Sequence, residues 1–123
     1  MEDQIESEIK AKGLTAPRVT PQDIEDSIAC EVSFVVGNVL KDCPVHASLK
    51  LLTFCIITLK NGFTVTGESA CASPENFNAE IGQKIARENA KQKIWPLLGF
   101  QLKQRLYDWA ASPASPSAAS GCI

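Results

Sequence analysis

The pattern of apolar and polar residues between Leu51 and Trp95 predicts two strands, a turn and a helix, which together make most of a small core. Leu51–Leu59 is apolar at nearly every position except Thr53 and Thr58. A continuous apolar run of this length is typical of a strand that is covered on both faces. We therefore expect a central strand here.

The dipeptide Asn61-Gly62 separates this strand from a second β-prone segment, Phe63–Thr66. Asn-Gly is a strong hairpin signal, because a type I′ turn needs positive φ at both central residues. With a two-residue loop, the register follows from the turn. The expected facing pairs are Lys60 with Phe63, Thr58 with Val65, Ile56 with Gly67, and Phe54 with Ser69, and the opposite face holds Leu59, Ile57 and Cys55 with Thr64, Thr66 and Glu68.

An N-terminal helix is predicted by Thr20-Pro21-Gln22-Asp23, where a capping threonine precedes a proline and an acid. Ile24, Ile28 and Val32 would then mark its buried side. The β-branched and aromatic run Val32–Val36 is compatible with a short strand or with the extended end of this helix. The sequence leaves both readings open.

A second helix is predicted from Ser73-Pro74-Glu75-Asn76, which has the same cap, proline and acid. Pro96 should kink or restart this helix near Trp95. The fold class is therefore α+β, with an N-terminal helix, an antiparallel β-hairpin that a third short strand would extend, and a long kinked C-terminal helix pair. We expect an acidic arm over residues 1–19 whose order the sequence leaves open, a single domain over 20–110, and a disordered Pro/Ser/Ala tail over 111–123.

Composition narrows the class to a soluble globular protein. The chain has 123 residues, of which 45% are hydrophobic and 21% charged. No apolar run approaches the roughly 18 residues of a membrane span, and the acidic start lacks the features of a signal peptide. We expect neither membrane insertion nor secretion.

Charge is distributed unevenly along the chain. Residues 1–31 carry eight acids and three bases, whereas residues 84–123 carry six bases and two acids. This asymmetry favours pairing within the chain or between subunits over attraction of an external anion. Nucleic-acid binding is not favoured, since the net charge is −2 and the bases are spread over two helices.

Metal and cofactor sites are not indicated. The five cysteines include no C-x-x-C motif, and the odd number fits a reducing cytoplasm. Cys43 and His46 form a C-x-x-H pair, but a structural zinc site needs a second spaced pair. No glycine-rich phosphate loop with its lysine is present. We expect no metal, no cofactor and no catalytic residue.

Polar residues gather in the segment Glu68 to Asn78, next to the start of the second predicted helix. Free amides at a helix N-terminus can receive a phosphate or carboxylate. The simpler interpretation is that Ser73 only caps the helix and that Glu75 satisfies its dipole. The candidate ligand-binding residues are Glu68, Ser69, Ser73, Asn76, Asn78, Lys84 and Arg87.

The helix that follows has a thin polar stripe. At 100° per residue, Glu80, Lys84, Arg87 and Lys91 fall in one narrow arc, while most of the remaining surface is apolar or small. Such a helix is covered on two sides, by its own hairpin and by something else. We therefore expect a homo-oligomer, although the small residues of this helix could equally lie against the sheet.

The segment LKNGFTVTGESAC, followed by NFNAEIG and KIWPLLGF, resembles a family of small proteins from tailed phages and prophages that is often labelled gene-product-49-like. The resemblance covers residues 52–102 and extends to TPQDIEDSI at 20–28. It implies a phage accessory protein expressed in the bacterial host cytoplasm. It brings no catalytic residues, and the acidic arm and the tail lie outside it.

These observations favour a non-enzymatic binding protein that acts on the host. One form is a homo-oligomeric scavenger of a small anionic, nucleotide-derived defence signal. A second form is an inhibitor that covers a host enzyme with the acidic arm. The remaining alternative is an enzyme that uses Glu68 as a base or Cys71 as a nucleophile, but neither residue has a partner that the spacing identifies.

Overall fold

The computed structural model describes residues 2–13, 16–40 and 44–111. It divides the chain into two compact units, one comprising Gln22–Ile94 and the other Met1–Pro21 together with Trp95–Ile123. The elements in chain order are α1 (Glu2–Ala11), α2 (Pro21–Asp26), β1 (Ile28–Val35), α3 (Val36–Val39), η1 (Ala47–Leu51), β2 (Leu52–Leu59), β3 (Thr64–Ala70), η2 (Pro74–Asn76), α4 (Ala79–Gln92) and α5 (Ile94–Ala111). The α+β class is confirmed. The predicted domain limits stay a prediction, and the tail beyond Ala111 lies outside the described residues.

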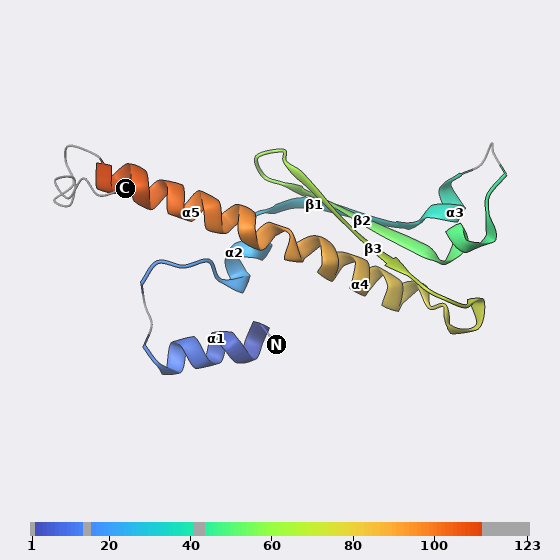
Figure 1. Cartoon of the computed structure of the whole chain (residues 1–123), viewed down its shortest axis with the longest axis horizontal. Helices are drawn as coiled ribbons and strands as arrows, with labels where there is room; N and C mark the ends of the chain where they lie inside the picture. Colours follow the sequence, from blue (N-terminus) through green and yellow to red (C-terminus); the bar gives the residue numbers. More distant parts are fainter. Residues whose placement is uncertain (1, 14–15, 41–43, 112–123) are drawn as a thin grey trace. The chain divides into compact units, whose positions relative to one another are not determined.

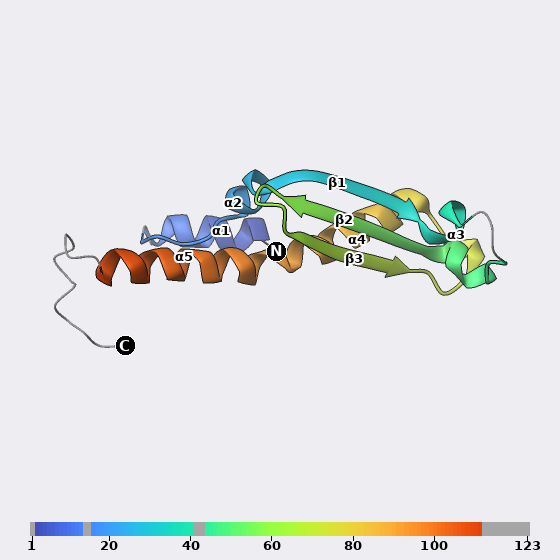
Figure 2. The same cartoon turned by 90° about the horizontal axis from the view of Figure 1, so that it is seen from above.

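The first unit is built on an antiparallel sheet with the order β1-β2-β3. Strand β2 is central, as the apolar run predicts, and β1 supplies the third strand. Helix α4 runs along one face of this sheet, as Figures 1 and 2 show from two sides. The core lies between that face and the helix.

The two faces of the sheet differ, which corrects the expectation that β2 is covered on both. Thr53, Cys55, Ile57 and Leu59 are buried beneath α4, and the residues between them are only half-buried. On the other face, Phe34 stacks on Phe54 with ring centroids 6.2 Å apart, and neighbouring Val32 is 55% exposed. Phe34 and Phe54 on that face thus pack against each other and are only half-buried within the first unit.

The predicted N-terminal helix is too long. Helix α2 ends at Asp26, and Ser27 Oγ donates a hydrogen bond to the carbonyl of Ile24 at 2.6 Å. Ile28 already belongs to β1, where it pairs with Leu59. Of the three residues expected on the buried helix side, only Ile24 is buried. The β-branched residues gain more from pairing with β2 than from continuing the helix.

The predicted hairpin register is wrong by one residue. Val65 pairs with Ile57 and Gly67 with Cys55, because the connection has three residues, Lys60 to Gly62. Within this connection only Gly62 has positive φ, at 92°, whereas a type I′ turn would also need positive φ at Asn61. A one-residue slip exchanges the faces of a strand, so Val65 is buried and Thr64 is exposed.

The long helix begins later than predicted. Pro74–Asn76 forms the short 3-10 helix η2, and Ser73 makes no side-chain capping bond there. The cap of α4 is Asn78, whose Oδ1 accepts from the amide of Ile81 at 3.1 Å. The buried residues of α4 are Gly82, Ala86 and Ala90, and these three small residues lie against the sheet. The sequence left open whether they face a partner or the sheet, and in the structure they face the sheet.

The second unit contains α1 and most of α5. Arg18 makes two hydrogen bonds to the carboxylate of Glu6, at 2.7 and 2.8 Å. Trp95 Nε1 donates to Glu2 at 3.1 Å. Helix α4 ends at Gln92, and α5 begins two residues later, so that Pro96 lies in its first turn. There a missing N–H costs little, and the predicted interruption of the helix is confirmed.

Candidate ligand-binding site

A cavity of about 220 Å³ lies in the first unit, between the start of α4 and the sheet. Its walls come from β2, from the end of β3, from the segment that contains η2, and from the first two turns of α4. The cavity therefore lies at the junction that joins the hairpin to the helix. The lining residues are Leu51, Thr53, Ser69, Ala70, Cys71, Asn76, Phe77, Asn78, Ile81, Gly82 and Ile85.

Thr53 is the unusual residue of this cavity. Its side chain belongs to the buried face of β2 and is only 1% exposed. Its Oγ1 has no hydrogen-bond partner among the described residues. A buried hydroxyl without a partner costs on the order of 1 to 3 kcal/mol. A polar group on a ligand within the cavity would remove that cost.

The backbone of Gly82 passes close to this hydroxyl. A Cβ atom at Gly82 would lie 2.9 Å from Thr53 Oγ1 and 3.5 Å from its Cβ. Any larger residue at this position would therefore crowd the hydroxyl. Glycine in a helix interior is unfavourable by roughly 1 kcal/mol relative to alanine. The structure thus combines two locally unfavourable features at one point of the cavity.

The remaining walls combine apolar surfaces with neutral polar groups. Phe77 supplies an aromatic ring, and Ile81 and Ile85 are 56% and 46% exposed on α4. Ser69 pairs directly with Thr53 across the sheet and brings a second hydroxyl into the lining. Asn78 contributes an amide whose oxygen caps α4. The lining residues include no charged side chain.

Three of the seven predicted site residues line the cavity: Ser69, Asn76 and Asn78. Ser73 does not, although its Oγ accepts from Asn76 Nδ2 at 3.2 Å and so helps to hold that lining residue. Glu68 is exposed, and its backbone carbonyl accepts from Asn89 at 2.8 Å.

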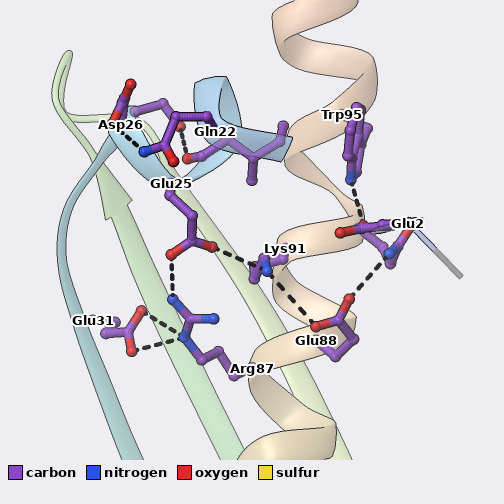
Figure 3. A network of polar contacts seen from close by, with 12 residues as sticks. Glu2, Gln22, Glu25, Asp26, Glu31, Arg87, Glu88, Lys91 and Trp95 are labelled. Atoms are coloured by element: carbon purple, nitrogen blue, oxygen red, sulfur yellow. Dashed lines mark hydrogen bonds and ion pairs between the residues drawn. The ribbon is translucent and has the colours of Figure 1, made fainter. Parts of the chain in front are cut away.

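The two predicted basic residues do not line the cavity either. Lys84 is exposed on α4. Arg87 lies one turn further along and is engaged by acids of α2 and β1, as Figure 3 shows. Its Nε lies 2.9 Å from Glu31, and its Nη2 lies 3.0 Å from Glu25. Acids from the N-terminal part of the chain thus form ion pairs with a base of α4 within the first unit.

Lys91 completes this network. Its Nζ lies 3.0 Å from the second oxygen of Glu25, so that one carboxylate bridges two bases of α4. The hydrogen bond from Lys91 is the main cause that lowers the pKa of Glu25 below its usual value; burial opposes it with the next-largest effect, and the hydrogen bond from Arg87 lowers the pKa further. The hydrogen bond to Glu31 is the main cause that raises the pKa of Arg87. The network ties α2 and β1 to the far end of α4.

Reasoning from the sequence missed Thr53 and Gly82. Thr53 carried a signal, since it is a polar residue within an otherwise apolar strand. Gly82 carried a weaker one, as a glycine inside a helical pattern. Neither signal reveals that the two residues meet, because that depends on where α4 crosses β2.

The other candidate residues, Cys71, Glu68 and His46, do not come together in a site among the described residues. Cys71 Sγ donates to the carbonyl of Ser73 at 3.2 Å, and Glu68 lies on an exposed position of β3. His46 caps η1 and accepts from the amide of Ser48 at 3.2 Å. Within the described part of the chain, no cluster of three or more metal-ligating side chains occurs. Cys43 lies outside the described residues.

Fold and cavity together define a small α+β protein with a neutral, partly apolar cavity at a strand-helix junction. The chain belongs to the Phage protein (N4 Gp49/phage Sf6 gene 66) family, whose profile matches residues 19–106. The matched range contains the sheet, the whole cavity and α4, and the predicted resemblance is confirmed. No curated protein and no solved structure matches the chain at a significant level. Over the described residues, the structure contains no helix long and apolar enough to cross a membrane.

Proposed function

We propose that this phage protein is a non-enzymatic binding protein that holds a small ligand in the cavity between β2 and α4. The observation that carries the proposal is that Thr53, a residue that lines the cavity, has a buried hydroxyl without a partner among the described residues. Buried polar groups are almost always satisfied in folded proteins, so each exception calls for an explanation. A ligand that bonds to Thr53 provides one.

The biological role that fits a phage family is action on the host in its cytoplasm. A protein that binds without turnover can sequester a signal molecule, and a nucleotide-derived defence signal remains our candidate. The cavity, at about 220 Å³, is smaller than the roughly 300 to 1,000 Å³ of most ligand pockets. It would therefore hold one part of such a ligand and leave the rest outside.

Two apolar surfaces of the first unit favour a homo-oligomer. The exposed Ile81 and Ile85 stand at the rim of the cavity, where a second subunit could cover the bound ligand. The half-buried Phe34 and Phe54 on the opposite face of the sheet offer an apolar surface for assembly. Native mass spectrometry of the purified chain reports the subunit number directly. A strictly monomeric protein would contradict this part of the proposal.

An enzymatic role is less well supported. Catalysis by a carboxylate or thiolate needs a positioned proton partner, and the hydrogen bond recorded for Cys71 leads to a backbone carbonyl. Replacement of Glu68 and Cys71 by alanine should leave the cellular effect unchanged. The inhibitor alternative is weakened as well, because Glu6 and Glu8 of the acidic arm pair with Arg18 and Lys12.

The proposal is tested by screening a fragment library against the ¹⁵N-labelled protein by NMR. The library should contain heterocycles, sugars, carboxylates and phosphates. We expect binding fragments to shift the amide signals of cavity residues, among them Ser69, Phe77 and Gly82. Gly82→Ala should abolish these shifts, and the matched variant Gly99→Ala, at an open position of α5, should not. If no fragment of any class perturbs the cavity, the proposed function is wrong.

A further inference from the structure

We infer that the group held in the cavity is an uncharged planar heterocycle of the nucleobase class, and that any charged part of the ligand remains outside. The inference rests on the proposed function, which it makes more specific. It also revises the expectation that a phosphate binds at the helix N-terminus. Charge, hydrogen bonding and size each support it.

The charge of the cavity argues against a buried anion. Its lining has no charged side chain, and transfer of an unpaired charge into such an environment is strongly unfavourable. Glu80, in the first turn of α4, already brings negative charge to the positive end of the helix dipole. Arg87 and Lys91, two cations further along the helix, form ion pairs with Glu25. A phosphate therefore finds no counter-charge within the cavity.

The hydrogen-bonding groups of the cavity match a heterocycle. Hydroxyl and amide side chains can both donate and accept, and Thr53, Ser69 and Asn78 place such groups in the lining. The edge of a nucleobase presents donors and acceptors side by side. An aliphatic ligand would leave Thr53 Oγ1 without a partner, whereas a carboxylate or phosphate would accept from the hydroxyl but would place a charge in a neutral cavity.

The walls and the size of the cavity match the flat faces of such a ring. Phe77 offers a surface for stacking, and Ile81 offers apolar contact. Stacking of a base on an aromatic side chain contributes about 1 to 3 kcal/mol. A sugar ring, with hydroxyls around its whole edge, would leave these apolar walls unmatched. A volume of about 220 Å³ limits the occupant to a single ring system.

The test is isothermal titration calorimetry of the full-length chain with four nucleosides, their 5′-monophosphates, ribose 5-phosphate and inorganic phosphate. We expect at least one nucleoside to bind, and its monophosphate to bind within about threefold of the same affinity. Ribose 5-phosphate and phosphate should bind at least about tenfold more weakly. A loss of about tenfold corresponds to one hydrogen bond of ordinary strength.

Two variants assign the binding to the cavity. Thr53→Val keeps the shape of the side chain and removes the hydroxyl, so it should weaken the nucleoside about tenfold. Thr58→Val, on the opposite face of the same strand, is the matched control and should bind as the natural chain does. Thermal unfolding of both variants verifies that they fold.

Three results would overturn the inference. One is a ribose 5-phosphate affinity equal to that of the nucleotide, and another is an unchanged nucleoside affinity in a folded Thr53→Val variant. The third is binding of none of these compounds. In each case the proposed function still stands if the NMR screen finds a different class of fragment in the cavity. If that screen is also empty, both proposals fail.

Discussion

The two ends of helix α4 contact the same sheet in opposite ways. At the C-terminal end, Ala86 and Ala90 are fully buried, and their backbone lies directly against Gly67 of β3. Toward the N-terminal end, Gly82 lies close to the side chain of Thr53, and both residues line the cavity. One end is packed as closely as backbone atoms allow, and the other keeps a cavity.

The two ends of α4 also differ in charge. Near the C-terminal end, Arg87 and Lys91 form ion pairs with acids of α2 and β1. At the N-terminal end, the lining of the cavity is neutral. The difference teaches that stability and the candidate binding site are located at separate ends of one helix. The two can therefore be altered independently.

Gly67→Ala should have the largest effect. The added Cβ would collide with the carbonyl of Ala86 and the amide of Ala90, which cannot move aside without shifting the helix. Overpacking of this kind costs typically 1 to 3 kcal/mol and occasionally more, so we expect a loss of about 3 kcal/mol in the free energy of unfolding. Urea denaturation followed by circular dichroism measures it. A loss below about 1 kcal/mol would show that the close packing is absent.

Thr53→Val should act in the opposite direction. It removes a buried hydroxyl that has no partner and should raise the free energy of unfolding by about 1 kcal/mol while weakening the ligand. The same denaturation experiment, with Thr58→Val as control, detects the gain. A destabilised Thr53→Val variant would mean that the hydroxyl is satisfied in solution without a ligand.

Gly82→Ala should have a still smaller effect on stability. Alanine gains roughly 1 kcal/mol in helix propensity, and the contact with Thr53 Oγ1 offsets much of this gain. Gly99→Ala, where nothing lies within 4 Å of the added Cβ, should show the gain undiminished. Their thermal unfolding midpoints, compared side by side, isolate the contribution of the contact. Equal midpoints would contradict the crowding at Gly82.

The smallest predicted effect is a pH dependence at the other end of α4. The lowered pKa of Glu25 means that its contribution to stability is fully present above the ordinary value of 4.5 and is lost as the pH falls through the lower, folded-state pKa. Because the carboxylate is 41% exposed, solvent screening limits this contribution to under about 1 kcal/mol. Urea midpoints of the natural chain and of Glu25→Gln should differ at neutral pH and converge in acid. A constant difference would contradict the pairing.

Local signals in the sequence predicted which elements form better than they predicted the register and the bounds of those elements. The apolar run, the Asn-Gly dipeptide and Pro96 correctly indicated the central strand, the hairpin and the interrupted helix. The register was wrong because the backbone of Asn61 does not adopt positive φ, a choice that the dipeptide alone does not decide. The first helix was too long because pairing with a distant strand outweighed its helical periodicity.

The sequence predicted only those residues of the candidate site that lie in one continuous segment. Ser69, Asn76 and Asn78 come from one polar segment, and the sequence identified all three. Thr53 and Gly82 meet only because α4 crosses β2, and no local pattern encodes that crossing. Arg87 was assigned to the site because its partners, Glu25 and Glu31, lie 62 and 56 residues away in the chain.

The length of the turn between β2 and β3 limits which mutations the strand tolerates. Its three residues determine which side of β3 faces α4, because the removal of one residue would bury Thr64 and Thr66 and expose Val65. Substitutions in the turn alter its local energy only, whereas a deletion inverts every later position of the strand. We therefore expect this turn to tolerate substitutions better than a deletion, apart from a substitution of the glycine at its end.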